Sequence, residues 1–381
     1  MNQTSITTVI DEFTTLSATR LVEDAPKDTD KYGFNKVTKT VKITMQDNTE
    51  KILNIGDKAS DGNYYAMIKD DKKVYMIAGN LIDEFSKKNT DFRDTTITTI
   101  DTTTLKYILI AQTGVQNVEL KVNDSQTDTE TQGGINGWNL IQPYKYTYSG
   151  NDQNIQTLTT AIANLKPASV VDENPKDLST YGLDKPTLDI TLKDSKATLH
   201  LIAGKKKDDS TSYFKLADSS TIYTIDDSAL ASFRVKPFDM VSKFAYIVNI
   251  DTVDKVNITS KDSKVDIALS RTTKKAEKTG DKDTVVTTYK VDSKDVEESK
   301  FKTLYQELIG LSVDAENDKK LDVKPEVSIT YTLNAGNEKT VTVDFVPYND
   351  QFYAVYRGGK SDFLIAKTSV TKMIDDFKNI K

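Results

Sequence analysis

The chain has 381 residues, contains no cysteine, and carries a formal net charge of −6. The absence of cysteine excludes disulfides, thiolate metal sites and cysteine nucleophiles. The acidic balance argues against a nucleic-acid partner, because neutralising phosphates requires a basic surface.

The first part of the chain predicts a helix followed by a small antiparallel sheet. Apolar residues recur with the spacing of one helix face at Ile6, Val9, Phe13 and Leu16. Apolar residues then alternate with polar ones in four short segments, which predicts four strands in a meander. An apolar turn at residues 81–85 predicts a closing helix, so residues 1–97 are expected to form one unit.

The same pattern returns 149 residues later. Residues 26–36 and 175–185 share six of eleven positions, including the pairs Tyr32-Gly33 and Tyr181-Gly182. Self-similarity at a fixed offset is the signature of a duplicated structural unit. Glycine permits positive φ where the loop turns into the first strand, so both pairs and Pro186 are interpreted as a structural signature. Residues 151–243 are expected to form the second unit.

A third copy is more diverged. The helical spacing recurs at Phe301, Leu304, Leu308 and Leu311, but the Tyr-Gly pair is absent. Residues 299–381 are therefore expected to form the third unit, and residues 98–150 and 244–298 are expected to be β-hairpin modules between units. The predicted fold class is α+β: a tandem repeat of helix plus four-stranded antiparallel meander units, joined by β-hairpin modules in an elongated multi-unit chain.

The second unit resembles the bacterial domain-of-unknown-function 4340 family. The residues that carry this resemblance are the string Tyr181–Pro186, the strand end Ala203-Gly204, and the strands at Tyr213 and Ile222. The first unit matches except that Phe34, Asn35 and Val37 replace the Leu, Asp and Pro of the second unit. The third unit matches in pattern only. The resemblance implies an envelope protein, usually tethered by one N-terminal transmembrane helix and often encoded beside ABC transporters of the gliding-motility type. No catalytic residues are established for that family, so the resemblance assigns none to this chain.

Localisation follows from this resemblance. No apolar run of the chain approaches the roughly 18 residues of a membrane helix. We therefore expect an extracytoplasmic protein, tethered to the cell membrane by an N-terminal helix that is absent from this chain.

The search for chemistry finds no catalytic, cofactor or metal site. Residues 354–361 satisfy a relaxed P-loop pattern, but a predicted strand follows where the motif needs a helix, so no nucleotide is expected. His200 is the only histidine, which excludes histidine triads and multi-histidine metal sites. Three acidic clusters lack the EF-hand spacing of a Ca²⁺ site and are interpreted as solvated loops. They are Asp57/Asp61, Asp124/Asp128/Glu130 and Asp281/Asp283.

One aromatic segment is a candidate interaction surface. Tyr144, Tyr146 and Tyr148 alternate along a predicted strand, shortly after Trp138, the only tryptophan. An exposed aromatic face can bind a glycan or a partner. A face packed on the following helix gives the same pattern, so both interpretations remain open.

Three functions from different classes are weighed against the sequence. The favoured one is a non-enzymatic extracytoplasmic scaffold or interaction module, accessory to a membrane ABC transporter, whose protein partner is a transporter subunit or another envelope component. The alternative is a glycan- or peptide-binding module that uses the aromatic face near Trp138–Tyr148. A carboxylate-based hydrolase would need two converging acids, and the sequence offers no such pair.

Overall fold

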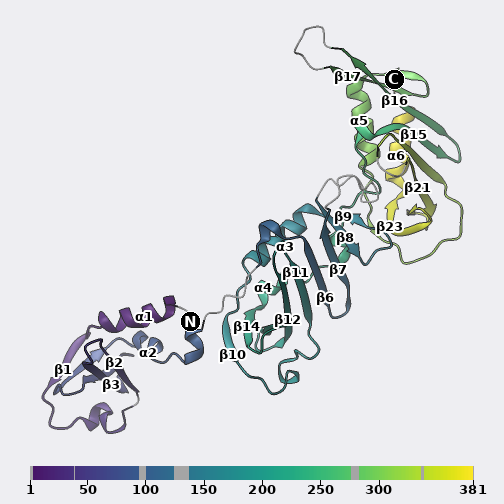
Figure 1. Ribbon diagram of the computed structural model, residues 1–381. Helices are drawn as coiled ribbons and strands as arrows, with labels where there is room; N and C mark the ends of the chain where they lie inside the picture. The colour runs from purple at the N-terminus through teal and green to yellow at the C-terminus, as the bar shows by residue number, and fades with distance from the viewer. Residues whose placement is uncertain are drawn as a thin grey trace. The chain divides into compact units, whose positions relative to one another are not determined.

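A computed structural model describes residues 3–37, 39–93, 100–123, 137–275, 283–335 and 339–380 (Figure 1). Contacts divide the chain into two compact units. The first comprises Met1–Thr96, Pro167–Asn174 and Thr221–Thr224, and the second comprises Ile97–Lys166, Pro175–Ser220 and Ile225–Lys381.

The N-terminal residues form a five-stranded antiparallel sheet covered by two helices. The elements are α1 (Gln3–Thr14), β1 (Arg20–Asp24), β2 (Lys39–Thr44), β3 (Glu50–Lys58), β4 (Tyr64–Ile68), β5 (Lys73–Ile77) and α2 (Asn80–Glu84). The strand order is β1-β5-β4-β3-β2. Phe13 near the end of α1 and Ile82 of α2 pack in one apolar cluster with Leu53 and Ile55 of β3. Both helices therefore cover the same face of the sheet.

Strand β1 was not predicted. It pairs antiparallel with β5, from Arg20 opposite Met76 to Asp24 opposite Lys73, so the sheet has five strands where the sequence predicts four. Only Leu21 and Val22 are apolar in this strand, and Leu21 is exposed. Two adjacent apolar residues among charged ones give no alternating pattern, which is why sequence periodicity misses the strand.

The second sheet has nine strands. Its elements, with the two helices that accompany it, are β6 (Tyr107–Gln112), β7 (Val115–Val122), β8 (Trp138–Gln142), β9 (Tyr148–Ser149), α3 (Asp152–Ala163), β10 (Ser169–Asp172), β11 (Leu188–Lys193), β12 (Thr198–Lys206), β13 (Thr211–Leu216), β14 (Ile222–Asp226) and α4 (Asp227–Ala231). The strand order is β10-β14-β13-β12-β11-β6-β7-β8-β9. Strand β6 pairs antiparallel with β11, so the strands of residues 98–150 extend the sheet of the residues that follow them.

The third sheet repeats this order. Its elements are β15 (Val253–Ser260), β16 (Lys264–Lys274), β17 (Thr284–Val291), β18 (Lys294–Val296), α5 (Glu298–Ile309), β19 (Ala315–Glu316), β20 (Val327–Leu333), β21 (Thr340–Pro347), β22 (Phe352–Arg357), β23 (Lys360–Ala366) and α6 (Lys367–Lys378). The order β19-β23-β22-β21-β20-β15-β16-β17-β18 equals that of the second sheet with nine added to each strand number. The chain is therefore an α+β protein whose described residues form three largely antiparallel sheets.

The apolar faces of the two longer internal helices account for much of the core beside these sheets. Helix α3 buries Ile155, Leu158 and Ile162, and α5 buries Phe301, Tyr305 and Leu308. In α5 the buried residue is Tyr305 rather than the predicted Leu304, and the Tyr305 hydroxyl donates to the Val248 carbonyl at 3.0 Å. This bond satisfies the one polar group that the tyrosine places in the core.

The Tyr-Gly pairs lie in matching loops. Gly33 and Gly182 have φ of +82° and +67°, and each ends a short 3-10 turn. The Tyr32 ring lies 4.8 Å from that of Tyr65, and the Tyr181 ring lies 5.0 Å from that of Tyr213. Positive φ favours glycine, so both loops depend on that residue for their turn.

Two further features complete the fold. Pro186 lies just before β11, and its carbonyl accepts a hydrogen bond from the Thr113 hydroxyl at 3.3 Å. Among the helices of the described residues, none has both the length and the apolar character needed to cross a bilayer.

Candidate functional site

The aromatic segment does not form the predicted strand. A cis peptide joins Gln142 to Pro143, and residues 143–147 follow an irregular bend before Tyr148 enters β9. Trp138 begins β8 opposite Val122, five residues before the bend. Tyr144, Tyr146 and Tyr148 therefore do not share a strand face, because the alternation of strand side chains does not extend through a bend.

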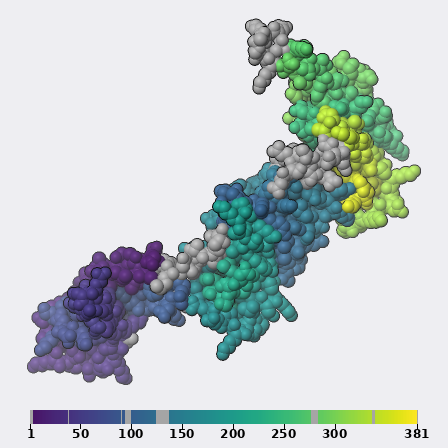
Figure 2. All heavy atoms as spheres, viewed as in Figure 1, coloured from purple at the N-terminus to yellow at the C-terminus, as the bar shows by residue number. Residues whose placement is uncertain are grey.

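Instead, the tyrosines pack against the end of the third sheet. The rings of Tyr144 and Tyr148 each lie 4.7 Å from that of Phe363 in β23. The Tyr148 hydroxyl and the Lys145 backbone N–H both donate to Asp362 at 3.0 Å. Figure 2 shows the blue residues of this region against the yellow residues of the third sheet. Neither alternative from the sequence anticipated this contact.

Burial changes the acid–base behaviour of two of these tyrosines. Burial raises the pKa of Tyr148 well above its usual range, and the nearby Asp362 charge raises it further. Burial also raises the pKa of Tyr144, whose hydroxyl donates to Glu316 at 2.6 Å. Both hydroxyls therefore stay protonated at neutral pH and act as hydrogen-bond donors at this contact.

The residues with the P-loop-like pattern form a β-hairpin. Arg357 pairs with Lys360 across the turn, and Gly358 and Gly359 have φ of +48° and +78°. Two consecutive central residues with positive φ define the type I′ turn that suits a two-residue hairpin. Strand β23 follows the turn directly, so no helix N-terminus faces the glycines.

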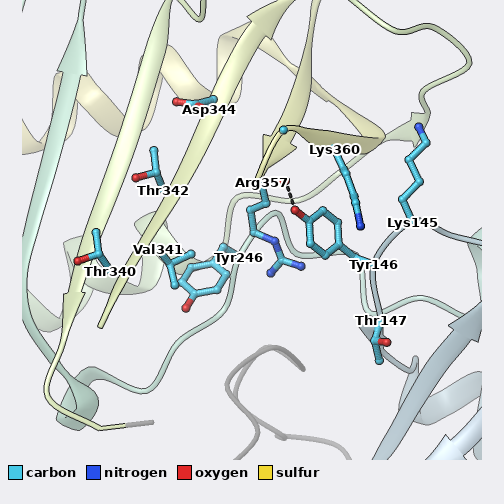
Figure 3. Close-up of a pocket in the computed structure, with 12 residues that line it drawn as sticks. Lys145, Tyr146, Thr147, Tyr246, Thr340, Val341, Thr342, Asp344, Arg357 and Lys360 are labelled. Atoms are coloured by element: carbon cyan, nitrogen blue, oxygen red, sulfur yellow. Dashed lines mark hydrogen bonds between the residues drawn. The ribbon is translucent and has the colours of Figure 1, made fainter. Parts of the chain in front are cut away.

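Tyr146 fixes this hairpin to the aromatic segment. Its hydroxyl donates a hydrogen bond to the Arg357 carbonyl (Figure 3). A Cβ atom on Gly358 would lie 2.5 Å from the Tyr146 hydroxyl oxygen. Gly358 therefore serves two purposes, because it allows the positive φ of the turn and leaves room for the tyrosine.

A cavity of about 570 Å³ lies beside the hairpin and is the candidate site. Its walls are residues 145–147, Tyr246, residues 340–342 and 344 of β21, and the hairpin turn. Figure 3 shows the Arg357 side chain between the rings of Tyr146 and Tyr246. The guanidinium carbon lies 4.7 Å and 5.7 Å from these two ring centroids, within the range of cation–π attraction.

The cavity is cationic although the chain is acidic. Lys145, Arg357 and Lys360 line it, and Asp344 is the one acidic side chain among the described residues of the wall. The Asp344 carboxylate accepts a hydrogen bond from the Ser328 hydroxyl at 2.5 Å. Within the described part of the chain, Arg357 has no carboxylate at ion-pair distance and lies beside the rings of Tyr146 and Tyr246. A carboxylate or phosphate group entering the cavity would therefore meet a guanidinium that no described acidic side chain neutralises.

Other residues that the sequence singled out have structural explanations. His200 pairs with Asp189 at 2.8 Å across β12 and β11, and both side chains are 39% exposed. No group of three or more histidine and acidic residues in the described ranges is arranged to hold a metal ion. Asp124, Asp128, Glu130 and Asp281 lie outside the described residues, so their clusters are not placed.

Sequence reasoning missed Arg357, Lys360 and Tyr246. Residues 357–360 belong to the P-loop-like pattern, but that pattern indicates a nucleotide site at a helix N-terminus and not a cavity beside a hairpin. The described wall of the cavity combines four segments between Lys145 and Lys360, and no local motif contains them all. An arginine and a lysine flanking a Gly-Gly turn were the one available signal.

Comparison with known proteins gives a family and no function. A family model described as a domain of unknown function (DUF4340) matches residues 1–147 and 138–334. No curated protein and no solved structure matches the chain significantly. Since the matched residues cover most of its length, the chain belongs to the DUF4340 family.

Proposed function

We propose that this chain is a non-enzymatic, extracytoplasmic interaction module built from tandem repeats and accessory to a membrane ABC transporter. The observation that carries the proposal is the recurrence of one element order. A helix, five strands and a second helix follow one another at residues 3–84, 152–231 and 298–378. Repeated units of this kind create broad surfaces, which suit binding to large partners.

The envelope and transporter parts of the proposal rest on the family resemblance described above. Charge supports a protein partner over nucleic acid, because the chain has six more acidic than basic residues. The repeated sheets add strand edges, which are surfaces that other polypeptides can extend.

Crosslinking in native membranes tests this proposal. The tagged full-length protein is crosslinked in cells, purified and analysed by mass spectrometry, with an untagged strain as the control. We expect transporter subunits to be enriched, with crosslinks to lysines of this chain. Recovery of no transporter subunit above the untagged control would contradict the accessory role.

A second candidate function is the binding of an acidic glycan, favoured by the cavity around Arg357. Tyr146 of the aromatic segment lines the cavity, whereas Tyr148 is buried against Phe363. A volume of about 570 Å³ lies within the range of small-ligand sites. Lys145 forms an ion pair with Asp362 at 3.8 Å, which leaves Arg357 and Lys360 as the cations that attract acidic substituents. Because aromatic rings also stack on sugar faces, the proposed glycan site is this cavity and not a strand face.

Calorimetry with uronic-acid oligosaccharides and with inorganic phosphate tests the second candidate. Arg357→Gln removes the central cation, and Lys319→Gln is the matched control, because Lys319 lies 4.4 Å from the Tyr348 ring outside the cavity wall. We expect Arg357→Gln to weaken binding at least tenfold and Lys319→Gln to leave it unchanged. Equal binding by both variants would show that these ligands do not bind in the cavity around Arg357.

A further inference from the structure

Strand β2 differs from its counterparts in the other two sheets. It is the last strand of the first sheet, and within the described residues it pairs with β3 alone. Strands β11 and β20 occupy the same place in their units, but β6 and β15 pair with their other edges. The first sheet therefore ends where the other two continue.

The strand registers give the equivalent residues. Lys39 lies opposite Ile55 in β3, as Leu188 lies opposite Ala203 and Val327 opposite Phe345. Counting from these pairs, the counterparts of Val41 and Ile43 are Ile190 and Leu192 in β11, and Ile329 and Tyr331 in β20.

These positions are fully buried where a neighbouring strand pairs with that edge, and only half-buried where no described strand does. All four counterparts are at most 1% exposed, whereas Val41 and Ile43 are only half-buried. Residues that pair with the counterparts from β6 and β15, among them Ile110 and Ile258, are also at most 1% exposed. The open edge of β2 thus exposes apolar surface that a further strand would bury.

The backbone at this edge is arranged to accept a strand. The Met45 N–H donates to the Thr49 carbonyl at 2.8 Å, next to the pair Thr44 and Glu50. Because hydrogen-bonded and non-bonded pairs alternate in an antiparallel ladder, the N–H and C=O groups of Thr40, Lys42 and Thr44 point away from β3. These groups are oriented to form the backbone hydrogen bonds of an added antiparallel strand.

Charge narrows the choice of partner. Lys39 and Lys42 lie on the strand, and Lys42 forms an ion pair with Glu50 at 2.5 Å. Lysines on an edge strand oppose pairing with a second copy, because like charges would be brought together. They favour a strand that carries an acidic side chain.

We propose that the β2 edge binds an extended segment of another protein as an added antiparallel strand. Its alternate apolar residues face Val41 and Ile43, and an acidic residue lies opposite Lys42. The partner strand takes the place that β6 takes beside β11. The inference stands on sheet geometry and does not depend on the transporter or glycan proposals.

The β6 sequence supplies a probe of known register. Leu109 lies opposite Thr191, the counterpart of Lys42. Two labelled peptides of residues 106–112 are compared, one with Leu109→Glu and one with Leu109→Lys, by fluorescence anisotropy against the full chain. We expect the glutamate peptide to bind at least tenfold more tightly than the lysine peptide.

Variants of Lys42 locate the binding. Lys42→Pro removes an outward N–H, and an edge strand tolerates proline there because this N–H bonds no strand of the sheet. Lys42→Thr is the matched control, since it restores the residue of Thr191 and keeps the N–H. We expect Lys42→Pro to lose peptide binding, and Lys42→Thr to bind both peptides equally.

Lys42→Glu keeps the test decisive if the proline variant misfolds. It should reverse the preference, so that the lysine peptide binds more tightly. Absence of binding by both peptides, or binding by wild type that ignores the charge at residue 109, would overturn the proposal. A dimer in analytical ultracentrifugation that Lys42→Pro dissociates would also overturn it, because the occupant would then be a second copy.

Discussion

The carbonyl oxygen of Tyr181 occupies the space that a side chain on Gly204 would need. The same relationship joins Tyr32 to Gly56 in the first sheet. In the third sheet the register places Val346 where Gly204 stands, and there the Tyr-Gly loop is missing. A strand glycine and a loop pair are therefore present together or absent together, which indicates that they form one packing unit.

Replacing Gly204 with Ala should destabilise the second sheet by about 1–3 kcal/mol, the usual cost of overpacking. The new methyl group would overlap the Tyr181 carbonyl and displace the loop from β12. Hydrogen exchange of the β11 and β12 amides measures the effect locally.

Gly62→Ala provides the control for this prediction. Gly62 has φ of +88°, and apart from its chain neighbours no described residue lies within 4 Å of the position that a Cβ would take, so alanine there incurs the backbone cost of about 1 kcal/mol. Its effect should stay in the first sheet. Unchanged exchange at β12 in Gly204→Ala would contradict the packing argument.

The sequence predicts the helices and strands better than it predicts which strands pair with one another. Helix faces such as Ile155, Leu158 and Ile162 are buried as the spacing predicts, because local periodicity records which face meets the core. The short strand β1 was missed, since its stability comes from pairing with β5. The bend at residues 143–147 was predicted as a strand, because alternating tyrosines mimic strand periodicity.

The candidate site was largely beyond sequence reasoning. The sequence indicates Tyr146 as part of a strand face that is either exposed or packed on the following helix, whereas its hydroxyl bonds the Arg357 carbonyl 211 residues away. Contacts of that range are set by how sheets pack, and a single sequence carries no direct record of them.

Gly358→Ala should be more damaging than Gly359→Ala. Both glycines have positive φ, but only at Gly358 would the new methyl meet Tyr146, because beside Gly359 no side chain of the described residues lies within 4 Å of the methyl position. We expect both variants to lose about 1 kcal/mol for the backbone, with an added loss for Gly358→Ala.

A double-mutant cycle identifies the source of that added loss. Combining Gly358→Ala with Tyr146→Phe removes the hydroxyl that the methyl would contact, so the two changes should cost less together than the sum of their separate effects. Additive free energies of unfolding would show that the tyrosine does not restrict this turn.

Asp362 should matter more than Glu316 at the aromatic contact. Asp362 is 6% exposed and accepts hydrogen bonds from the Tyr148 hydroxyl and the Lys145 N–H, whereas Glu316 bonds Tyr144 near the surface. Asp362→Ala leaves two donors without a partner, which costs about 1–3 kcal/mol for each buried group. Glu316→Ala should cost less than about 1 kcal/mol. Urea denaturation compares the two, and equal losses would contradict the buried role of Asp362.

Alkaline pH should destabilise the third sheet in part through Tyr353. Burial, aided by a hydrogen bond to Glu326 at 3.0 Å, raises the pKa of Tyr353 to about 12, above the value of about 10 in an unfolded chain. A group whose pKa is raised by folding stabilises the protein fully below the unfolded value, and this stabilisation is lost as pH rises from about 10 to about 12. Tyr353→Phe should therefore lose less stability than wild type across that window, as measured by urea midpoints at stepped pH. Since the variant retains the other buried tyrosines, only part of the alkaline slope should disappear; identical slopes would show that the Tyr353 pKa does not differ between the folded and unfolded chains.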